Sequence, residues 1–211
     1  MEIIVIGAGG HATSIAESIL SCGHEILYFV DRYKSKDKLL GYKIVKNISK
    51  SKSNLNIVIA IGDNNKRFEI HKIFLNKTLK INFPSIIHPS ASVSKFAKIG
   101  FGTVVLQNAV VGSNCKIGRF CIINSSSSID HDCEMSNFSS LGPSSVTGGN
   151  VKIGLRSAIG INTTILQKVD IGKDVVVGSN SFVNKNFKSN LVVYGSPAKI
   201  IRKRNKDSNY L

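Results

Sequence analysis

The 211-residue sequence has no tryptophan, four prolines and four cysteines. Because Cys22, Cys115, Cys121 and Cys133 lie at no spacing typical of metal ligands, we expect free thiols in a reducing cytoplasm and no bound metal. No apolar run approaches the roughly 20 residues of a membrane-spanning helix. Residues 1–10 lack the basic leader of a signal peptide. These absences predict a cytoplasmic protein without membrane insertion.

Acidic residues are also scarce, with 13 Asp and Glu against 28 Lys and Arg, which gives a net charge of +15. Most of the basic excess lies in residues 32–52 and 199–206. The chain has no alternation of aromatic and basic residues and no known reader module, so a nucleic acid partner is disfavoured. A phosphate-rich small molecule, such as coenzyme A or a sugar nucleotide, suits the same charge.

A strict six-residue repeat runs through the second half of the chain. Every sixth residue from Ile87 to Val183 is aliphatic or methionine, except Thr147. The residue two places earlier is small or β-branched, as at Ala91, Cys133 and Ser181. A period of six fits neither an α-helix nor a single strand, but it fits a coil with flat faces about six residues long. A β-sandwich would need turn signals every 8–12 residues, which are missing.

The repeat therefore predicts a left-handed parallel β-helix over residues 84–211, which end in a basic tail. Stacked coils would bury one aliphatic column per face and pair their backbones in parallel ladders. Glycine often follows the aliphatic residue, and we expect it to supply the positive φ angles that some corners need. It occurs there at Gly100, Gly112, Gly118, Gly154, Gly160, Gly172 and Gly178.

Residues 1–83 differ in kind and predict a small Rossmann-like α/β domain. Apolar strands are expected at residues 1–6, 25–30 and 56–61, with helices at 12–20 and 66–76 and a polar, basic loop after Asp31. Strands that alternate with helices predict a parallel sheet. With about three strands, the domain is too small for the full dinucleotide-binding fold, and the domain boundary falls at residues 84–89.

The glycine turn at residues 7–11 is the first candidate site. It follows a strand and precedes a helix, so its backbone N–H groups are placed to bind a phosphate. Gly9 and Gly10 form the turn, and His11 could contact a phosphate or a sugar or simply begin the helix. Asp31 ends the next strand, where it could reach a ribose or a base. Alone, this pattern also fits a nicotinamide-dependent dehydrogenase.

His131 is the second candidate, because it alone among the five histidines lies mid-repeat and between two carboxylates, Asp130 and Asp132. Since Ile129 points inward, the residues after it are expected at an outer corner, within reach of a substrate. A neighbouring carboxylate raises the pKa of a histidine and fixes its tautomer, which suits it to act as a general base.

Six segments together resemble the sialic acid O-acyltransferase family, which includes bacterial UDP-4-amino-sugar N-acetyltransferases. They span nearly the whole chain, in the family's order: residues 7–11, 31–32, 61–67, 124–133, 148–154 and 195–199. The resemblance implies an acetyl-CoA-dependent N-acetyltransferase. Its acceptor would be the amino group of a nucleotide-linked 4-amino-4,6-dideoxy sugar, for surface glycan or glycoprotein biosynthesis.

The resemblance also implies roles for single residues. His131 would be the general base and Asp132 the residue that orients it. The nucleotide sugar would contact Gly9, Gly10, His11, Asp31, Arg32, Gly62, Asn64 and Asn124. Acetyl-CoA would lie between two β-helices of a homotrimer, along Gly149, Ile161 and Gly178. One position departs from the family, because Ser140 stands where relatives often carry a second histidine.

Two alternatives stay open at this stage. One is O-acetylation of sialic acid or a related sugar. The other is a non-catalytic subunit that binds a nucleotide sugar and uses the β-helix only for assembly. Neither the nucleotide nor the sugar can be read from the residues themselves.

Overall fold

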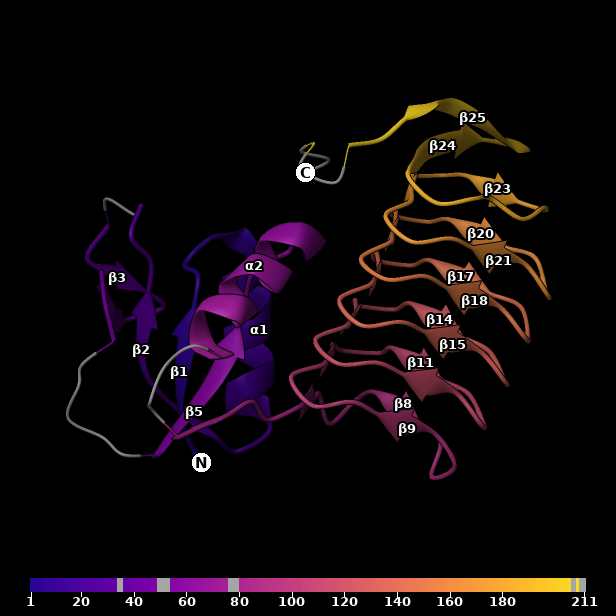
Figure 1. The fold of residues 1–211 in the computed structure, drawn as a ribbon. Coiled ribbons are helices and arrows are strands. Elements are labelled where there is room, and N and C mark those ends of the chain that lie inside the picture. The colour runs from indigo at the N-terminus through magenta and orange to yellow at the C-terminus, as the bar shows by residue number, and fades with distance from the viewer. Residues whose placement is uncertain (34–35, 49–53, 76–79, 206–207, 209–211) are drawn as a thin grey trace.

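The computed structural model describes residues 1–33, 36–48, 54–75, 80–205 and 208. An N-terminal α/β unit lies against one side of a parallel β-helix, and a C-terminal hairpin covers the last coil (Figure 1). The β-helix and the α/β domain both agree with the fold class predicted from the sequence.

The N-terminal sheet has six strands in the order β3-β4-β2-β1-β5-β6. Their bounds are β1 Glu2–Ile6, β2 Glu25–Val30, β3 Lys38–Leu39, β4 Tyr42–Val45, β5 Asn54–Ile59 and β6 Lys80–Asn82. All pairs are parallel except β3 with β4. Two helices, α1 Gly10–Ser21 and α2 Asn64–Leu75, cover opposite faces. Alternate residues of β1 point to the two faces, so that Ile3 packs with α1 and Ile4 packs with α2.

The prediction for this domain was wrong in two respects. The stretch after Asp31, predicted as a loop, contains the antiparallel pair β3 and β4, and β6 adds a further strand. These strands are short and partly exposed, so they lack the apolar run that marked β1, β2 and β5. The predicted end of the second helix at Asn76 lies outside the described residues.

The β-helix is built from two-residue strands in three sheets, and each residue pairs with the one eighteen positions later, as Val105 with Ile123. The domain-facing sheet contains β7 Ile86–Ile87, β10 Val104–Val105, β13 Ile122–Ile123, β16 Ser140–Leu141, β19 Ala158–Ile159 and β22 Val176–Val177. From Val105 to Val183 the predicted inward residues are buried, which confirms the phase of the repeat.

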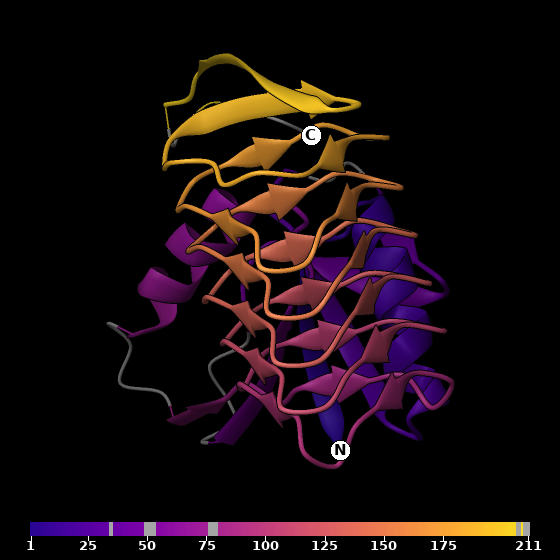
Figure 2. The ribbon, with the colours of Figure 1, turned by 90° about the vertical axis from the view of Figure 1, so that its right-hand side faces the viewer.

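The other two sheets face away from the N-terminal domain (Figure 2). The uncharged sheet contains β8 Ser92–Val93, β11 Val110–Val111, β14 Ser128–Ile129, β17 Val146–Thr147, β20 Thr164–Ile165 and β23 Phe182–Val183. The charged sheet contains β9 Lys98–Ile99, β12 Lys116–Ile117, β15 Glu134–Met135, β18 Lys152–Ile153 and β21 Asp170–Ile171. The two sheets are called uncharged and charged after the first residue of each strand, whose side chain points outward.

Glycine does not have the role that we expected at the corners. Positive φ falls mainly on other residues, among them Asn114 (59°), Asp132 (58°) and Asn150 (60°). Asn and Asp tolerate this conformation better than most residues. The glycines after the aliphatic column are needed for close stacking instead. A Cβ on Gly154 would lie 2.4 Å from the carbonyl carbon of Gly172 in the next coil.

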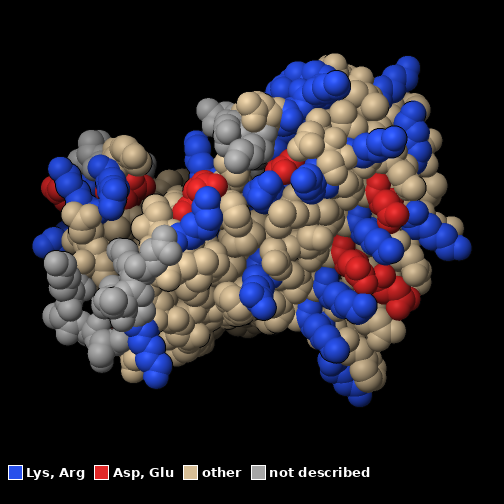
Figure 3. Space-filling view, viewed as in Figure 1, with Lys and Arg blue, Asp and Glu red and all other residues tan. Residues whose placement is uncertain are grey.

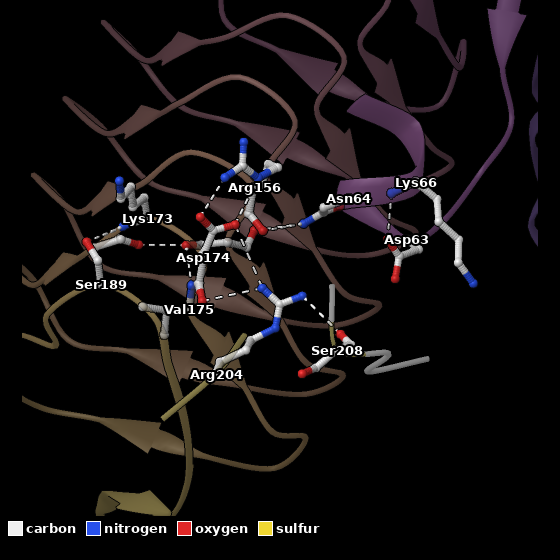
Figure 4. Close-up of polar contacts among 12 residues, drawn as sticks. Asp63, Asn64, Lys66, Arg156, Lys173, Asp174, Val175, Ser189, Arg204 and Ser208 are labelled. Carbon is white, nitrogen blue, oxygen red and sulfur yellow. Dashed lines mark hydrogen bonds and ion pairs between the residues drawn. The ribbon is translucent and has the colours of Figure 1, made fainter. Parts of the chain in front are cut away.

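The C-terminal hairpin was not predicted. Strands β24 Leu191–Gly195 and β25 Ala198–Lys203 pair antiparallel, and β24 extends the domain-facing sheet beyond β22. Beyond it, the buried Arg204 reaches back to Asp174 in the last coils, and its guanidinium lies 3.8 Å from that carboxylate (Figure 4). Arg204 therefore anchors the chain after β25 to the last coils.

Candidate active site

His131 lies at the corner that links β14 to β15, where the chain passes from the uncharged to the charged sheet. Its Nδ1 is 2.7 Å from Oδ2 of Asp132, and 55% of the His131 side chain is exposed. The backbone N–H of His131 donates to Oδ1 of Asp130 at 2.8 Å. The left-handed conformation of Asp132 turns its carboxylate back toward the ring that precedes it. The predicted exposed position between two aspartates is therefore present.

The two aspartates set the charge of this corner. The hydrogen bond that His131 donates to Asp132 raises the pKa of His131, and the negative charge of Asp130 raises it further. The same hydrogen bond, together with one from Asn114, lowers the pKa of Asp132. Because an ionised carboxylate only accepts hydrogen bonds, the neutral ring must carry its proton on Nδ1. Its Nε2 is then a free acceptor, as a general base requires.

Gly149 lies against the His131 ring in the next coil. A Cβ there would be 2.5 Å from Cε1 and 2.6 Å from Nε2 of His131. The backbone N–H of Asn150 also donates to the His131 carbonyl at 3.0 Å. The glycine therefore makes room for the ring, and its backbone stands beside the predicted reacting nitrogen.

Asn114 was not predicted as a site residue. It lies one coil before Asp132 at the same corner, and its Nδ2 donates to Asp132 Oδ1 at 3.2 Å. A surface hollow of about 410 Å³ opens beside this pair, lined also by Lys98, Lys116 and Glu134. The spacing of eighteen residues, one full coil, is the signal that could have identified the contact.

The glycine turn has the predicted shape. Gly7 has a φ of 103°, and Gly9 precedes the first residue of α1, with Gly9 and Gly10 both exposed. Asp31 supports the turn, because its Oδ2 accepts from Ala8 N–H at 2.9 Å and its Oδ1 from Tyr33 N–H at 2.9 Å. Arg32 is exposed beside it. The exposed N–H end of α1 therefore stays open to an anion.

His11 does not fit a charged contact with phosphate. Its Nε2 is buried, with no hydrogen-bond partner in the part of the chain that the structure describes. Burial, and the nearby charge of Arg67, lower its pKa to about 4. The ring is therefore neutral at physiological pH, and the predicted phosphate contact would have no positive charge from it.

Asn64 makes contacts that were not predicted. Its side chain is fully buried and donates to Ser140 Oγ (3.1 Å) and to the carbonyls of Arg156 (3.2 Å) and Ser157 (3.0 Å) (Figure 4). These bonds direct the amide into the β-helix. Only the tertiary structure shows this contact, because the partners of Asn64 lie 76 or more positions later in the sequence. Asn64 is a structural contact between the domains.

Arg67 strengthens the same junction from one turn further along α2. Its guanidinium donates to the carbonyls of Ile61 and Gly62 in the N-terminal domain and of Phe120 and Phe138 in the β-helix. The Gly62 carbonyl accepts one of these bonds at 3.0 Å. The loop that contains Gly62 is thus fixed against the β-helix, which was not predicted.

The remaining predicted residues lie at a different corner, between the domain-facing and uncharged sheets. Asn124 is partly buried and accepts from Ser125 N–H at 2.9 Å, whereas Ile161 is 55% exposed. Gly178 stands below Tyr194 of the hairpin, and a Cβ there would be 2.7 Å from Tyr194 Cβ. The uncharged sheet separates this corner from His131 and Gly149.

One chain therefore does not bring the predicted site together. The N-terminal domain packs on the domain-facing sheet, where Ile86, Val104 and Ile122 share a core with α1. His131 lies between β14 and β15, at the corner where the two other sheets meet. The glycine turn and His131 therefore lie at separate places on one chain.

Residues 2–74 match the PglD N-terminal domain family. The acetyltransferase domain of PglB from Neisseria gonorrhoeae FA1090, solved with acetyl coenzyme A, is 30% identical, with a TM-score of 0.87 over 95% of this chain and 98% of that one. The chain belongs to this family of hexapeptide-repeat sugar N-acetyltransferases. PerB from Caulobacter crescentus, solved with CoA and GDP-perosamine, is also 30% identical, with a TM-score of 0.87 over 95% of this chain and 97% of that one.

WeeI from Acinetobacter baumannii AYE, at 24% identity and a TM-score of 0.87 over 95% of this chain and all of that one, supports the fold alone. No curated protein sequence matches the chain significantly. Among the described residues, no helix has both the length and the apolar character needed to cross a membrane. On the face shown in Figure 3, Lys and Arg are spread over both parts of the hexapeptide-repeat protein, with Asp and Glu among them.

Proposed function

We propose that the chain transfers the acetyl group of acetyl-CoA to the amino group of a nucleotide-linked 4-amino-4,6-dideoxy sugar. The observation that carries this proposal is the His131 corner, where an exposed imidazole has its Nδ1 2.7 Å from the Asp132 carboxylate and its Nε2 beside the backbone of Gly149. The family relationship supports the same chemistry, because its members were solved with acetyl coenzyme A or with CoA and GDP-perosamine.

In the proposed reaction the sugar nitrogen forms a bond to the thioester carbonyl carbon while His131 Nε2 takes one proton from that nitrogen. The carbon–sulfur bond then breaks, and the thiolate of CoA receives the proton from His131. The charged imidazole is stabilised by Asp132 between these two steps. The products are the N-acetyl sugar and CoA, and no covalent enzyme intermediate is needed.

The uncharged sheet suits contact with a second chain. Its outward residues are Ser92, Val110, Ser128, Val146, Thr164 and Phe182, none of them charged, and Val110 is 41% exposed. This sheet joins the His131 corner to the Asn124 corner. We therefore assign it to the interface of a homotrimer, with acetyl-CoA in the groove along Gly149, Ile161 and Gly178.

The nucleotide belongs, in this proposal, to the glycine turn of the N-terminal domain. The N–H groups at Gly9 and Gly10 bind a phosphate, and Asp31, Arg32 and the Gly62 loop border the nucleoside. Because this turn and His131 lie at separate places on one chain, the sugar reaches the His131 and Asn124 of a neighbouring chain. The complete active site then needs two subunits.

The proposal is tested by measuring acetyl-CoA turnover with two classes of acceptor. One class is UDP-, dTDP- and GDP-linked 4-amino sugars, and the other is free and CMP-linked sialic acids. The mass of each product then shows whether an acetyl group was added. We expect acetylation of an amino sugar, and a kcat about 10²–10⁴-fold lower for His131→Ala. His24→Ala, which removes an imidazole far from this corner, is the matched control. Turnover of a sialic acid alone, or full activity of His131→Ala, would contradict the proposal.

A further inference from the structure

The carboxylate of Asp132 is held from two sides. Its Oδ2 faces His131 Nδ1 at 2.7 Å, and its Oδ1 accepts the amide N–H of Asn114 at 3.2 Å. Asn114 lies one coil earlier in the same left-handed conformation, with a φ of 59° against 58° for Asp132. The repeat itself therefore stacks the amide directly beside the carboxylate, without any help from the N-terminal domain.

Asp132 needs such a restraint because 43% of its side chain is exposed. An exposed carboxylate can leave its partner for water at little cost, and exposed ion pairs contribute little on their own. The Asn114 amide is a neutral donor that cannot compete with His131 for the same oxygen. It fixes one oxygen and thereby aims the other at the imidazole.

We propose that Asn114 is a positioning residue that keeps the carboxylate of Asp132 aligned with His131. This inference rests on the proposed function, because its effect is exerted through the general base. With Oδ2 aligned, the proton stays on Nδ1 and Nε2 remains the acceptor for the sugar amine. Partners that orient a metal-bound histidine commonly affect activity about 10–100-fold, and we expect an effect of that order here.

Other charged or titratable groups surround the pair and belong in the test. Asp130 and Cys133 flank it in its own coil, and Lys98, Lys116 and Glu134 border the adjoining hollow. The Lys116 ammonium pairs with the Glu134 carboxylate at 3.0 Å, so Lys116 is not what holds the Asp132 carboxylate in place. Within the part of the chain that the structure describes, the Asn114 amide is the donor that holds Oδ1 of Asp132.

The test compares Asn114→Ala and the isosteric Asn114→Asp with Asn190→Ala. Asn190 is exposed, has a φ of 62° and lies at the corner before β24, away from the corners of His131 and Asn124, so its substitution has a similar backbone cost. We expect kcat about tenfold lower in both Asn114 variants, with little change in KM. The Asn190 variant should retain the parental kcat.

A second readout separates positioning from a merely structural role. His131 titrated by NMR should show a lower pKa in Asn114→Ala, because its bond to Asp132 is then made for a smaller fraction of the time. The acid limb of the kcat/KM profile should move to lower pH by the same amount. Unchanged His131 titration in the folded variant, or normal kcat in Asn114→Asp, would overturn the inference. If the parent protein acetylates no amino sugar, the proposed function fails instead, and the NMR titration still decides the contact.

Discussion

At the scale of single residues, the charge on His131 governs the pH dependence. Asp132 first, and then Asp130, raise the pKa of His131 above its usual value near 6.5. The general base must be neutral, so kcat/KM should increase with pH and level off above that raised pKa. Asp132→Asn removes the larger cause of the raised His131 pKa. The acid limb of the kcat/KM profile should therefore move to lower pH, while kcat falls. Measuring kcat/KM against pH for the parent protein and for Asp132→Asn checks this prediction. If the acid limb stays at the same pH, the ionisation belongs to another group.

Gly149 tests the geometry of the same ring. An added Cβ meets only the His131 side chain within 3.1 Å, so Gly149→Ala should displace the ring and lower kcat at least tenfold, with little change in Tm. Gly154→Ala is the matched control, because its Cβ would meet the backbone of Gly172. Overpacking there should cost about 1–3 kcal/mol of folding free energy. Tm and kcat measured for both variants check this prediction. An equal decrease in Tm for Gly149→Ala and Gly154→Ala would contradict it.

The residue scale also shows how far sequence reasoning reaches. His131 and Asp132 were predictable because a local pattern, a histidine between aspartates after an inward Ile129, determines both exposure and pairing. Asn114 was not, since in sequence it resembles any other corner asparagine and its contact spans a full coil. The contacts of Asn64 with the β-helix and the burial of the His11 ring were not foreseen, because both depend on tertiary packing and not on a local pattern.

At the scale of elements, the period of six was sufficient for the β-helix because each coil repeats one packing rule. The strands β3, β4 and β6 follow no such rule, and their few apolar residues pack only partly buried against the domain core. The β24–β25 hairpin was missed for a similar reason, since all of β25 except Ala198 is exposed and half of its residues are basic. Strength of a local pattern, rather than length of an element, decided what could be predicted.

The α2 helix depends on Arg67 for its contact with the β-helix. Arg67→Met should lower the free energy of unfolding by about 2–4 kcal/mol, because it leaves the buried carbonyls of Phe120 and Phe138 without a charged donor. Lys66→Met, one residue earlier and exposed, should change it by less than about 0.5 kcal/mol. Urea unfolding followed by CD measures both. Equal stability of the two variants would mean that Arg67 is not needed at the junction.

At the scale of the whole molecule, the glycine turn and His131 lie at separate places on one chain, so the proposed site can be split between variants. His131→Ala removes the base. Gly10→Glu places a carboxylate at the phosphate site, where a Cβ meets nothing within 4 Å and an acidic residue suits the start of α1. Each variant alone should be nearly inactive although folded and trimeric.

Mixed trimers of the two variants should regain activity. With random assembly from equal amounts, about a quarter of the interfaces pair an intact glycine turn with an intact His131 of the next chain. Co-expression followed by purification of mixed trimers, with turnover measured against the parent, checks this. A double variant carrying both changes in one chain, co-expressed with itself, is the inactive control. If the mixed trimers stay as inactive as that control, the site must be completed within one chain, and the N-terminal domain would have to leave the domain-facing sheet for catalysis.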